Sequence, residues 1–133
     1  LKLAEGPVVA SHSNCRALCD VRRNLTDEQL RAIRDTGGVI GVNVYHGFVH
    51  AEPRMQTAAM LARHAAHIAE TIGPEHVACG FDFCEYFGPG NEGCEGMESC
   101  AQTGNFFFEL ERLGFSAAER QGIASENLLR VLE

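Results

Sequence analysis

The chain has 133 residues, of which 45% are hydrophobic and 22% charged, which is enough for one domain and too little for two. Its net charge is −7 and its basic residues are scattered, which argues against a nucleic-acid partner. No apolar run approaches the roughly 18 residues of a membrane span, and the first residues lack a signal-peptide pattern, so a cytoplasmic location is the default expectation.

The first predicted element is a short buried strand over residues 7–11, which runs into a polar loop. A helix then begins at Thr26, whose side chain can form a capping box with Gln29. Gly37 and Gly38 end this helix, because a left-handed C-cap favours residues without a Cβ atom. Together these segments form one βα unit.

The second unit repeats the pattern, with a strand over residues 39–45 whose unbroken apolar run suits a parallel sheet covered on both faces. A loop over 46–53 and a helix over 55–72 follow, and Gly73 ends the helix. A third strand is predicted over 76–81. Three successive βα units predict three parallel, neighbouring strands.

The segment from about 84 to 104 changes character, with five glycines, four glutamates and no basic residue. Loops of this length inside compact domains are commonly functional, and we predict a lid-like loop. Three helices are predicted after this segment. The first begins near residue 105, the second at a capping box formed by Ser116 and Glu119, and the third covers residues 125–132.

Polar side chains follow each predicted strand: His12 after the first, Tyr45 after the second and Asp82 after the third. The carboxyl ends of parallel strands meet on one rim, so we expect these side chains to lie together. Arg23 lies in the first loop of that rim, where a guanidinium can bind a carboxylate through two hydrogen bonds. Ordinary alternatives are a hydrogen-bonded loop histidine, a solvated arginine and an aspartate that caps a turn.

The other histidines and the cysteines give weaker signals. His46 and His50 are four residues apart, as ligands on one helix face would be, but the neighbouring glycine and proline favour a loop. We expect His64 and His67 at the surface, on the polar flank of the helix over 55–72. The six cysteines include no CxxC pair, which favours reduced thiols over a structural zinc site.

Four motifs occur in one order along the chain: residues 7–14 with 22–30, then 37–43, then 80–83, then 126–131. Through these motifs the chain resembles the carboxy-terminal part of the membrane (renal) dipeptidase family. The resemblance covers residues 1–133 outside the glycine-rich loop. It implies an α/β fold in which this chain supplies the last three βα units of a TIM (βα)8 barrel of the metal-dependent hydrolase type.

The resemblance also implies a zinc metallopeptidase, in which two zinc ions are bridged by a carboxylate and by a hydroxide that attacks the peptide bond of a dipeptide. By its motif, His12 resembles a zinc ligand and Arg23 the residue that holds the terminal carboxylate of the substrate. Asp82 resembles the catalytic aspartate that contacts the substrate and handles the proton. Tyr45 and Asn43 are expected to line the substrate site.

The chain also departs from the family pattern. No His-x-Asp pair occurs, and Cys84 stands where a carboxylate commonly follows the catalytic aspartate. Most of the family's zinc ligands precede the motifs found here, so this segment alone is not expected to assemble the two-zinc centre. The expected partners are a dipeptide and the remainder of the barrel or a partner chain, and a homo-oligomer is compatible with the sequence.

An alternative interpretation is a non-catalytic α/β binding module, in which Arg23 and the loop over 84–104 recognise a small acidic or peptidic ligand. The incomplete ligand set favours this alternative, whereas the presence of His12, Arg23 and Asp82 on one rim opposes it. A third interpretation is a local zinc site with four ligands: His12, His46, His50 and Asp82.

Overall fold

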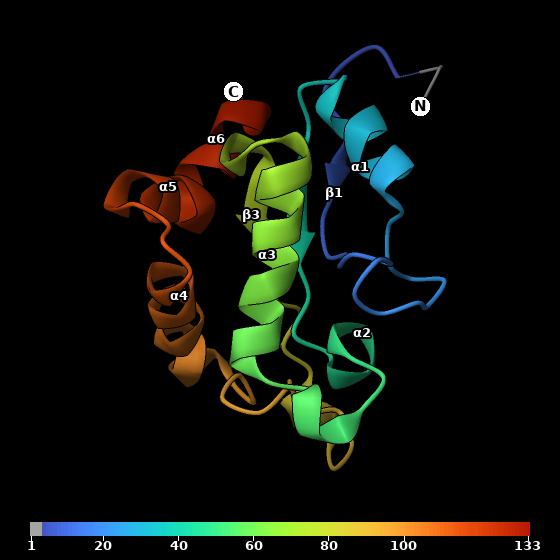
Figure 1. Ribbon diagram of the computed structural model, residues 1–133, viewed down its shortest axis with the longest axis vertical. Coiled ribbons are helices and arrows are strands. Elements are labelled where there is room, and N and C mark those ends of the chain that lie inside the picture. Colours follow the sequence, from blue (N-terminus) through green and yellow to red (C-terminus); the bar gives the residue numbers. More distant parts are fainter. Residues whose placement is uncertain (1–3) are drawn as a thin grey trace.

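The computed structural model describes residues 4–133, and its centre is a parallel sheet of three strands (Figure 1). Neighbouring strands pair in chain order, and the middle strand is buried along its whole length. The strands are β1 (Val9–Ala10), β2 (Val39–Val42) and β3 (Val77–Cys79). The prediction of three parallel, neighbouring strands is confirmed.

The strands are shorter than predicted, and β2 shows the physical reason. The strand predicted over 39–45 ends at Val42. The next backbone N–H, that of Asn43, donates to the side-chain oxygen of Asn14 at 2.8 Å instead of to a neighbouring strand. The polar residues that follow the strands therefore lie in loops at the carboxyl edge of the sheet.

The first crossover helix, α1 (Asp27–Arg34), begins where the sequence predicts and ends at Arg34, before the predicted stop at Gly37. The Thr26 hydroxyl accepts the Gln29 N–H at 3.3 Å, and the Gln29 side chain accepts the Thr26 N–H at 2.9 Å. This reciprocal pair satisfies two donors that the helix itself leaves unpaired. Beyond the helix, Gly37 has a φ of +76°, a conformation that favours glycine.

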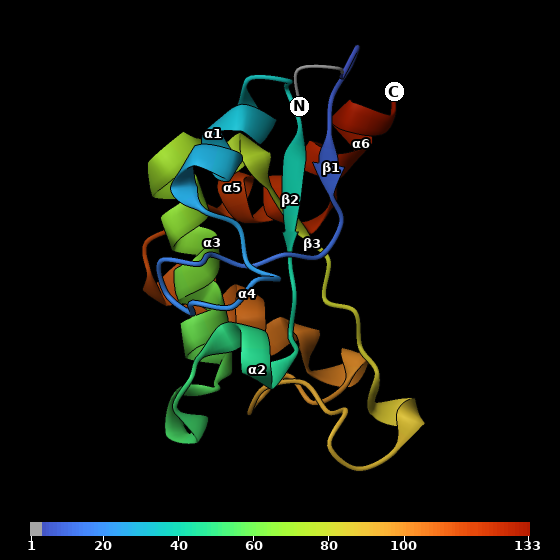
Figure 2. The ribbon, with the colours of Figure 1, turned by 90° about the vertical axis from the view of Figure 1, so that its right-hand side faces the viewer.

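The second crossover helix, α3 (Ala58–Ile72), covers the sheet with its apolar face. It begins three residues later than predicted, because the Thr57 hydroxyl caps it by accepting the Met60 N–H at 3.2 Å. In Figure 2, α1 and α3 lie on the same side of the sheet. The predicted apolar positions of α3 are all buried: Ala58, Leu61, Ala65, Ile68 and Ile72.

The chain ends in three helices, α4 (Thr103–Arg112), α5 (Ala117–Gln121) and α6 (Asn127–Leu132). The second predicted capping box is present at the start of α5, where the Ser116 hydroxyl accepts the Glu119 N–H at 3.1 Å. A π-helical turn over Gly122–Glu126 leads into α6.

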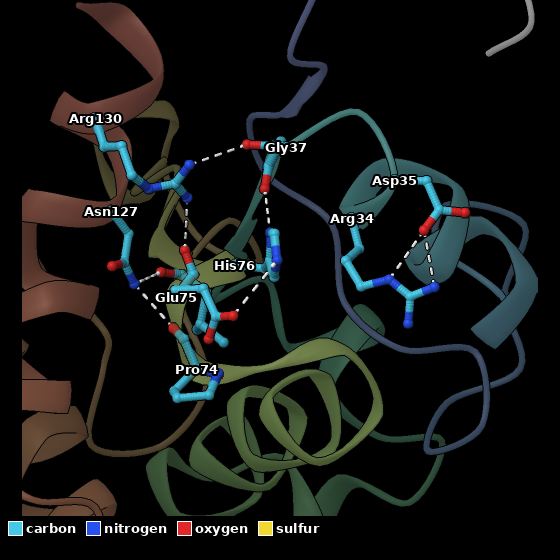
Figure 3. Close-up of polar contacts among 10 residues, drawn as sticks. Arg34, Asp35, Gly37, Pro74, Glu75, His76, Asn127 and Arg130 are labelled. Atoms are coloured by element: carbon cyan, nitrogen blue, oxygen red, sulfur yellow. Dashed lines mark hydrogen bonds and ion pairs between the residues drawn. The ribbon is translucent and has the colours of Figure 1, made fainter.

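The last sequence motif, residues 126–131, forms hydrogen bonds that connect α6 to the segments preceding β2 and β3 (Figure 3). Asn127 is buried and donates to the carbonyls of Pro74 at 2.9 Å and Val77 at 2.7 Å. The Arg130 guanidinium donates to the carbonyls of Gly37 at 3.2 Å and Glu75 at 2.9 Å. These bonds lie at the amino ends of the strands, so we assign this motif to stability.

One segment predicted as a loop is partly helical. The loop predicted over 46–53 contains the single-turn helix α2 (His46–Val49), in which the His50 N–H donates to the His46 carbonyl at 3.3 Å. A 3-10 turn over Pro53–Met55 follows. The prediction of a loop was wrong here because one turn of helix is too short to produce a periodic apolar pattern.

The glycine-rich segment, residues 84–104, has an exposed first half and a second half that packs on the domain. Tyr86 and Phe87, in its first half, are 74% and 69% exposed. Its second half is anchored, because Cys94 and Met97 are buried and the Cys94 N–H donates to the Val44 carbonyl at 2.8 Å. Among the described residues, no helix combines the length and the apolar character needed to span a membrane.

Candidate functional site

The candidate site lies at the carboxyl end of the sheet. In Figure 2 the strands point toward the end of the molecule that holds α2 and the glycine-rich segment, and α6 lies at the opposite end. We call residues 11–25 the first rim loop and residues 43–50 the second rim loop, because they follow β1 and β2 at this edge.

Two glycines explain how side chains from separated strands meet. A Cβ atom at Gly41 or at Gly80 would overlap the carbonyl oxygen of Ser11. The chain that leaves β1 therefore passes closely over β2 and β3. As a result, His12 reaches Asp82 although β1 and β3 are not neighbours in the sheet.

The two side chains meet through defined atoms. His12 Nε2 lies 3.9 Å from Asp82 Oδ2, and both side chains are partly exposed. The other ring nitrogen, Nδ1, lies 2.7 Å from the Ser11 hydroxyl, which orients the imidazole with Nε2 toward the carboxylate. An imidazole nitrogen and a carboxylate oxygen are both zinc ligands, so this pair fits part of a metal centre.

Asp82 has an unusual backbone conformation, and two side chains donate to its carboxylate. Its φ of +58° makes it the one non-glycine residue with a positive φ among residues 4–133. Such backbone conformations cost energy and are concentrated at functional sites. Asn43 Nδ2 lies 3.4 Å from Asp82 Oδ2 and donates to it, and the Cys84 thiol donates to Oδ1 at 3.7 Å.

The residue two positions after Asp82 is a thiol, Cys84, and not a carboxylate. Desolvation and the neighbouring Asp82 carboxylate raise the pKa of the Cys84 thiol. The thiol is therefore a neutral donor at pH 7. Asp82 thus has a hydrogen-bond donor beside it instead of a second negative charge.

Three of the five predicted site residues line one pocket of about 320 Å³. Asn43, which we also expected to line it, is buried and does not. Arg23, Tyr45 and Asp82 face this pocket together with Phe48 of the second rim loop and Phe87 of the glycine-rich segment. The Arg23 guanidinium carbon lies 5.5 Å from the centre of the Phe48 ring, a cation–π distance. The volume suits a small ligand with one anionic end.

Two buried asparagines, which the sequence analysis did not single out, join the rim loops. Asn14 and Asn24 both donate to the Phe48 carbonyl, at 3.3 and 2.9 Å. Asn14 also donates to the Asn43 carbonyl at 2.9 Å. Asparagine in a loop normally indicates a local turn, so the sequence carried no signal for these long-range bonds.

The prediction that His64 lies at the surface was wrong. His64 is fully buried, because the first rim loop and α2 cover the flank of α3 from which it projects. His67 is half-buried, with Nε2 2.7 Å from Asp27 Oδ1 on α1. A helical wheel cannot show this burial, since the covering segments come from elsewhere in the chain.

Burial makes His64 a source of pH-dependent stability. Loss of water contact lowers the pKa of His64 from 6.5 to about 4. Between these values the unfolded chain binds a proton that the folded chain excludes, so the free energy of unfolding falls as pH drops from 6.5 toward 4. We expect His64 to account for about 3 kcal/mol of this loss.

Urea unfolding of the complete protein at several pH values in this window would measure the effect. His64→Gln should reduce the pH dependence relative to wild type, because glutamine does not titrate. The comparison with wild type isolates His64 from the carboxylates that titrate nearby. Equal slopes in both proteins would contradict the prediction.

The local zinc site considered from the sequence is not assembled. The His46 ring stacks on Tyr45 with centroids 4.5 Å apart, and His50 Nδ1 accepts the Glu52 N–H at 3.0 Å. Within residues 4–133, no three His, Cys, Asp or Glu side chains come close enough together to hold a metal ion. The third interpretation was therefore wrong. The His46 ring contacts Tyr45 and the His50 ring accepts a backbone N–H, so neither imidazole joins His12 and Asp82.

The similarity of this chain to known proteins extends over its whole length. The sequence profile of the membrane dipeptidase family, peptidase family M19, matches residues 1–133. An uncharacterized dipeptidase of Schizosaccharomyces pombe is 31% identical over 136 residues, which cover 98% of this chain and 31% of the relative. Human dipeptidase 3 is 31% identical over 131 residues, which cover 98% of this chain and 26% of the relative.

A solved structure gives the same result for the fold. The crystal structure of a metallo peptidase from Rhodobacter sphaeroides, liganded with a phosphinate mimic of the dipeptide L-Ala-D-Ala, matches with a TM-score of 0.85 at 28% identity. The match covers 98% of this chain and 37% of that chain. The chain thus spans between 26% and 37% of the length of these relatives.

These matches confirm the predicted fold class, since the three βα units superpose on part of a metallopeptidase with a TIM-barrel-type fold. The family profile extends over all 133 residues of this chain. The chain belongs to the membrane dipeptidase family, peptidase family M19.

Proposed function

We propose that the complete protein is a zinc-dependent dipeptidase. This chain supplies one zinc ligand, the residues that bind the substrate, and the carboxylate that transfers a proton during hydrolysis. The observation that carries the proposal is the meeting of four chemically suitable side chains on one rim. Arg23, Tyr45 and Asp82 line a single pocket, and His12 approaches Asp82 at its edge.

Arg23 is proposed to bind the terminal carboxylate of a dipeptide. A guanidinium presents parallel N–H donors that match the two carboxylate oxygens. The Arg23 guanidinium stacks on Phe48 through its flat face, which leaves its N–H donors available. The Tyr45 ring continues this wall of the pocket, with its centroid 4.8 Å from the centroid of the Phe48 ring. The pocket volume of about 320 Å³ supports a ligand of dipeptide size.

Asp82 is proposed to hold and transfer the proton during hydrolysis. One of its oxygens faces His12, and the Cys84 thiol donates to the other. A half-exposed carboxylate in this position can accept a proton from water and pass it to the departing amine. Zinc, when bound, lowers the pKa of a water molecule and polarises the substrate carbonyl.

His12 is proposed to bind zinc through Nε2, since Nδ1 already faces the Ser11 hydroxyl. A two-zinc centre needs more ligands than His12 alone can give. We propose that the remainder of the barrel supplies them and pairs with the outer edges of β1 and β3, which end the described sheet.

Metal removal from the complete protein tests the proposed function. Hydrolysis of simple dipeptides should disappear after treatment with a chelator and return when zinc is added, with about two zinc ions per chain by elemental analysis, as in two-metal sites. A chelated sample dialysed without zinc is the control. Full dipeptide hydrolysis in protein stripped of metal would contradict the proposal.

A further inference from the structure

The two rim loops are joined below the pocket by a residue for which the proposed function has no role. His64 projects from α3 and is fully buried beneath both loops. Its Nδ1 accepts the backbone N–H of Cys15 at 3.0 Å, and its Nε2 donates to the backbone carbonyl of Val49 at 2.8 Å. A backbone N–H can only donate, so the ring proton must be on Nε2.

The two bonds reach the parts of the rim that carry the pocket residues. Cys15 lies in the first rim loop between His12 and Arg23. Val49 directly follows Phe48, on whose ring the Arg23 guanidinium stacks at 5.5 Å. The spacing of the two loops therefore sets where Arg23 lies relative to the rest of the pocket.

A role as mere filler of the core does not account for this histidine. An apolar side chain of similar size would fill the space and would leave the Cys15 N–H and the Val49 carbonyl buried without that partner. The imidazole uses both ring nitrogens, one for each loop. His64 thus links the two loops from α3, in addition to the asparagine bonds that join them directly.

We infer that His64 is a positioning residue, which holds the two rim loops at the spacing where Arg23 and Tyr45 face the same substrate. This inference rests on the proposed dipeptidase function. His64 touches neither the pocket nor the reacting atoms, so it acts only through the loops.

Two conservative variants of the complete protein separate the two bonds. Asparagine places its side-chain oxygen where Nδ1 lies, so His64→Asn keeps the Cys15 bond and loses the Val49 bond. Glutamine places its side-chain nitrogen where Nε2 lies, so His64→Gln keeps the Val49 bond and loses the Cys15 bond. Each variant breaks the link, and we expect both to raise KM for a dipeptide about tenfold or more, with a smaller change in kcat.

Amide hydrogen exchange gives a readout that does not depend on activity. The Cys15 amide should stay protected in His64→Asn and exchange faster in His64→Gln, whereas residues 43–50 should exchange faster in His64→Asn. The matched control is His67→Gln on the same helix, because His67 bonds Asp27 of α1 and neither rim loop. In this control, KM and the exchange of both loops should equal those of wild type.

Wild-type KM in both His64 variants of an active enzyme would overturn the inference, even if the proteins were less stable. If neither variant folds, the ring tautomer in the wild-type protein decides: NMR should find the proton on Nε2, and a proton on Nδ1 would overturn the link. Failure of the proposed function would show separately, as wild-type protein that cleaves no dipeptide.

Discussion

Replacement of Asp82 by asparagine in the complete protein is expected to lower kcat for dipeptide hydrolysis about a thousandfold, with little change in KM. Asparagine has the shape of aspartate and tolerates the φ of +58° found here, so the backbone should keep its course. The amide cannot accept the proton that the proposed mechanism assigns to the carboxylate. Steady-state kinetics with a simple dipeptide measure the loss.

Asp20→Asn is a matched control for the Asp82 variant, because it makes the same change at an exposed position of the first rim loop. Its kcat should equal that of wild type. Zinc content should be measured in every variant, so that a lost metal is not mistaken for a lost proton acceptor. A kcat for Asp82→Asn within tenfold of wild type would exclude the proposed role. A wild-type protein that binds a dipeptide without hydrolysing it, together with an unchanged affinity in Asp82→Asn, would instead favour the non-catalytic binding module.

Replacement of Arg23 by alanine is expected to raise KM for a dipeptide about a hundredfold, because the substrate carboxylate loses a charged, two-bond partner. Arg23→Lys should give an intermediate KM. Lysine keeps the positive charge, but it lacks both the paired donors and the flat surface that stacks on Phe48. The measurement is kcat and KM for the same dipeptide in all three proteins.

The neighbouring Arg22→Ala is the control, since its side chain is exposed and does not line the pocket. A dipeptide with an amidated carboxyl end adds a test of the partner group. Amidation should weaken binding to wild type and have little further effect in Arg23→Ala, because each change removes one half of the same interaction. Equal sensitivity of both proteins to amidation would contradict the assignment.

Local features of the fold follow from neighbouring residues in the sequence. The capping box at Thr26 and Gln29 fixed the start of α1, and Gly73 fixed the end of α3. Such signals can be read because each depends on a few consecutive residues. The order of the βα units then placed His12, Tyr45 and Asp82 on one rim, since parallel strands end at one edge.

Contacts between distant segments decided the rest. Gly41 and Gly80 looked like ordinary strand residues, and only the folded chain shows that they let Ser11 cross the sheet and bring His12 to Asp82. His64 looked like a surface residue because a helical pattern describes one helix and not what covers it. The sequence by itself determined the fold class and the rim residues. Tertiary structure decided their spacing, because spacing depends on packing between segments that are far apart in the chain.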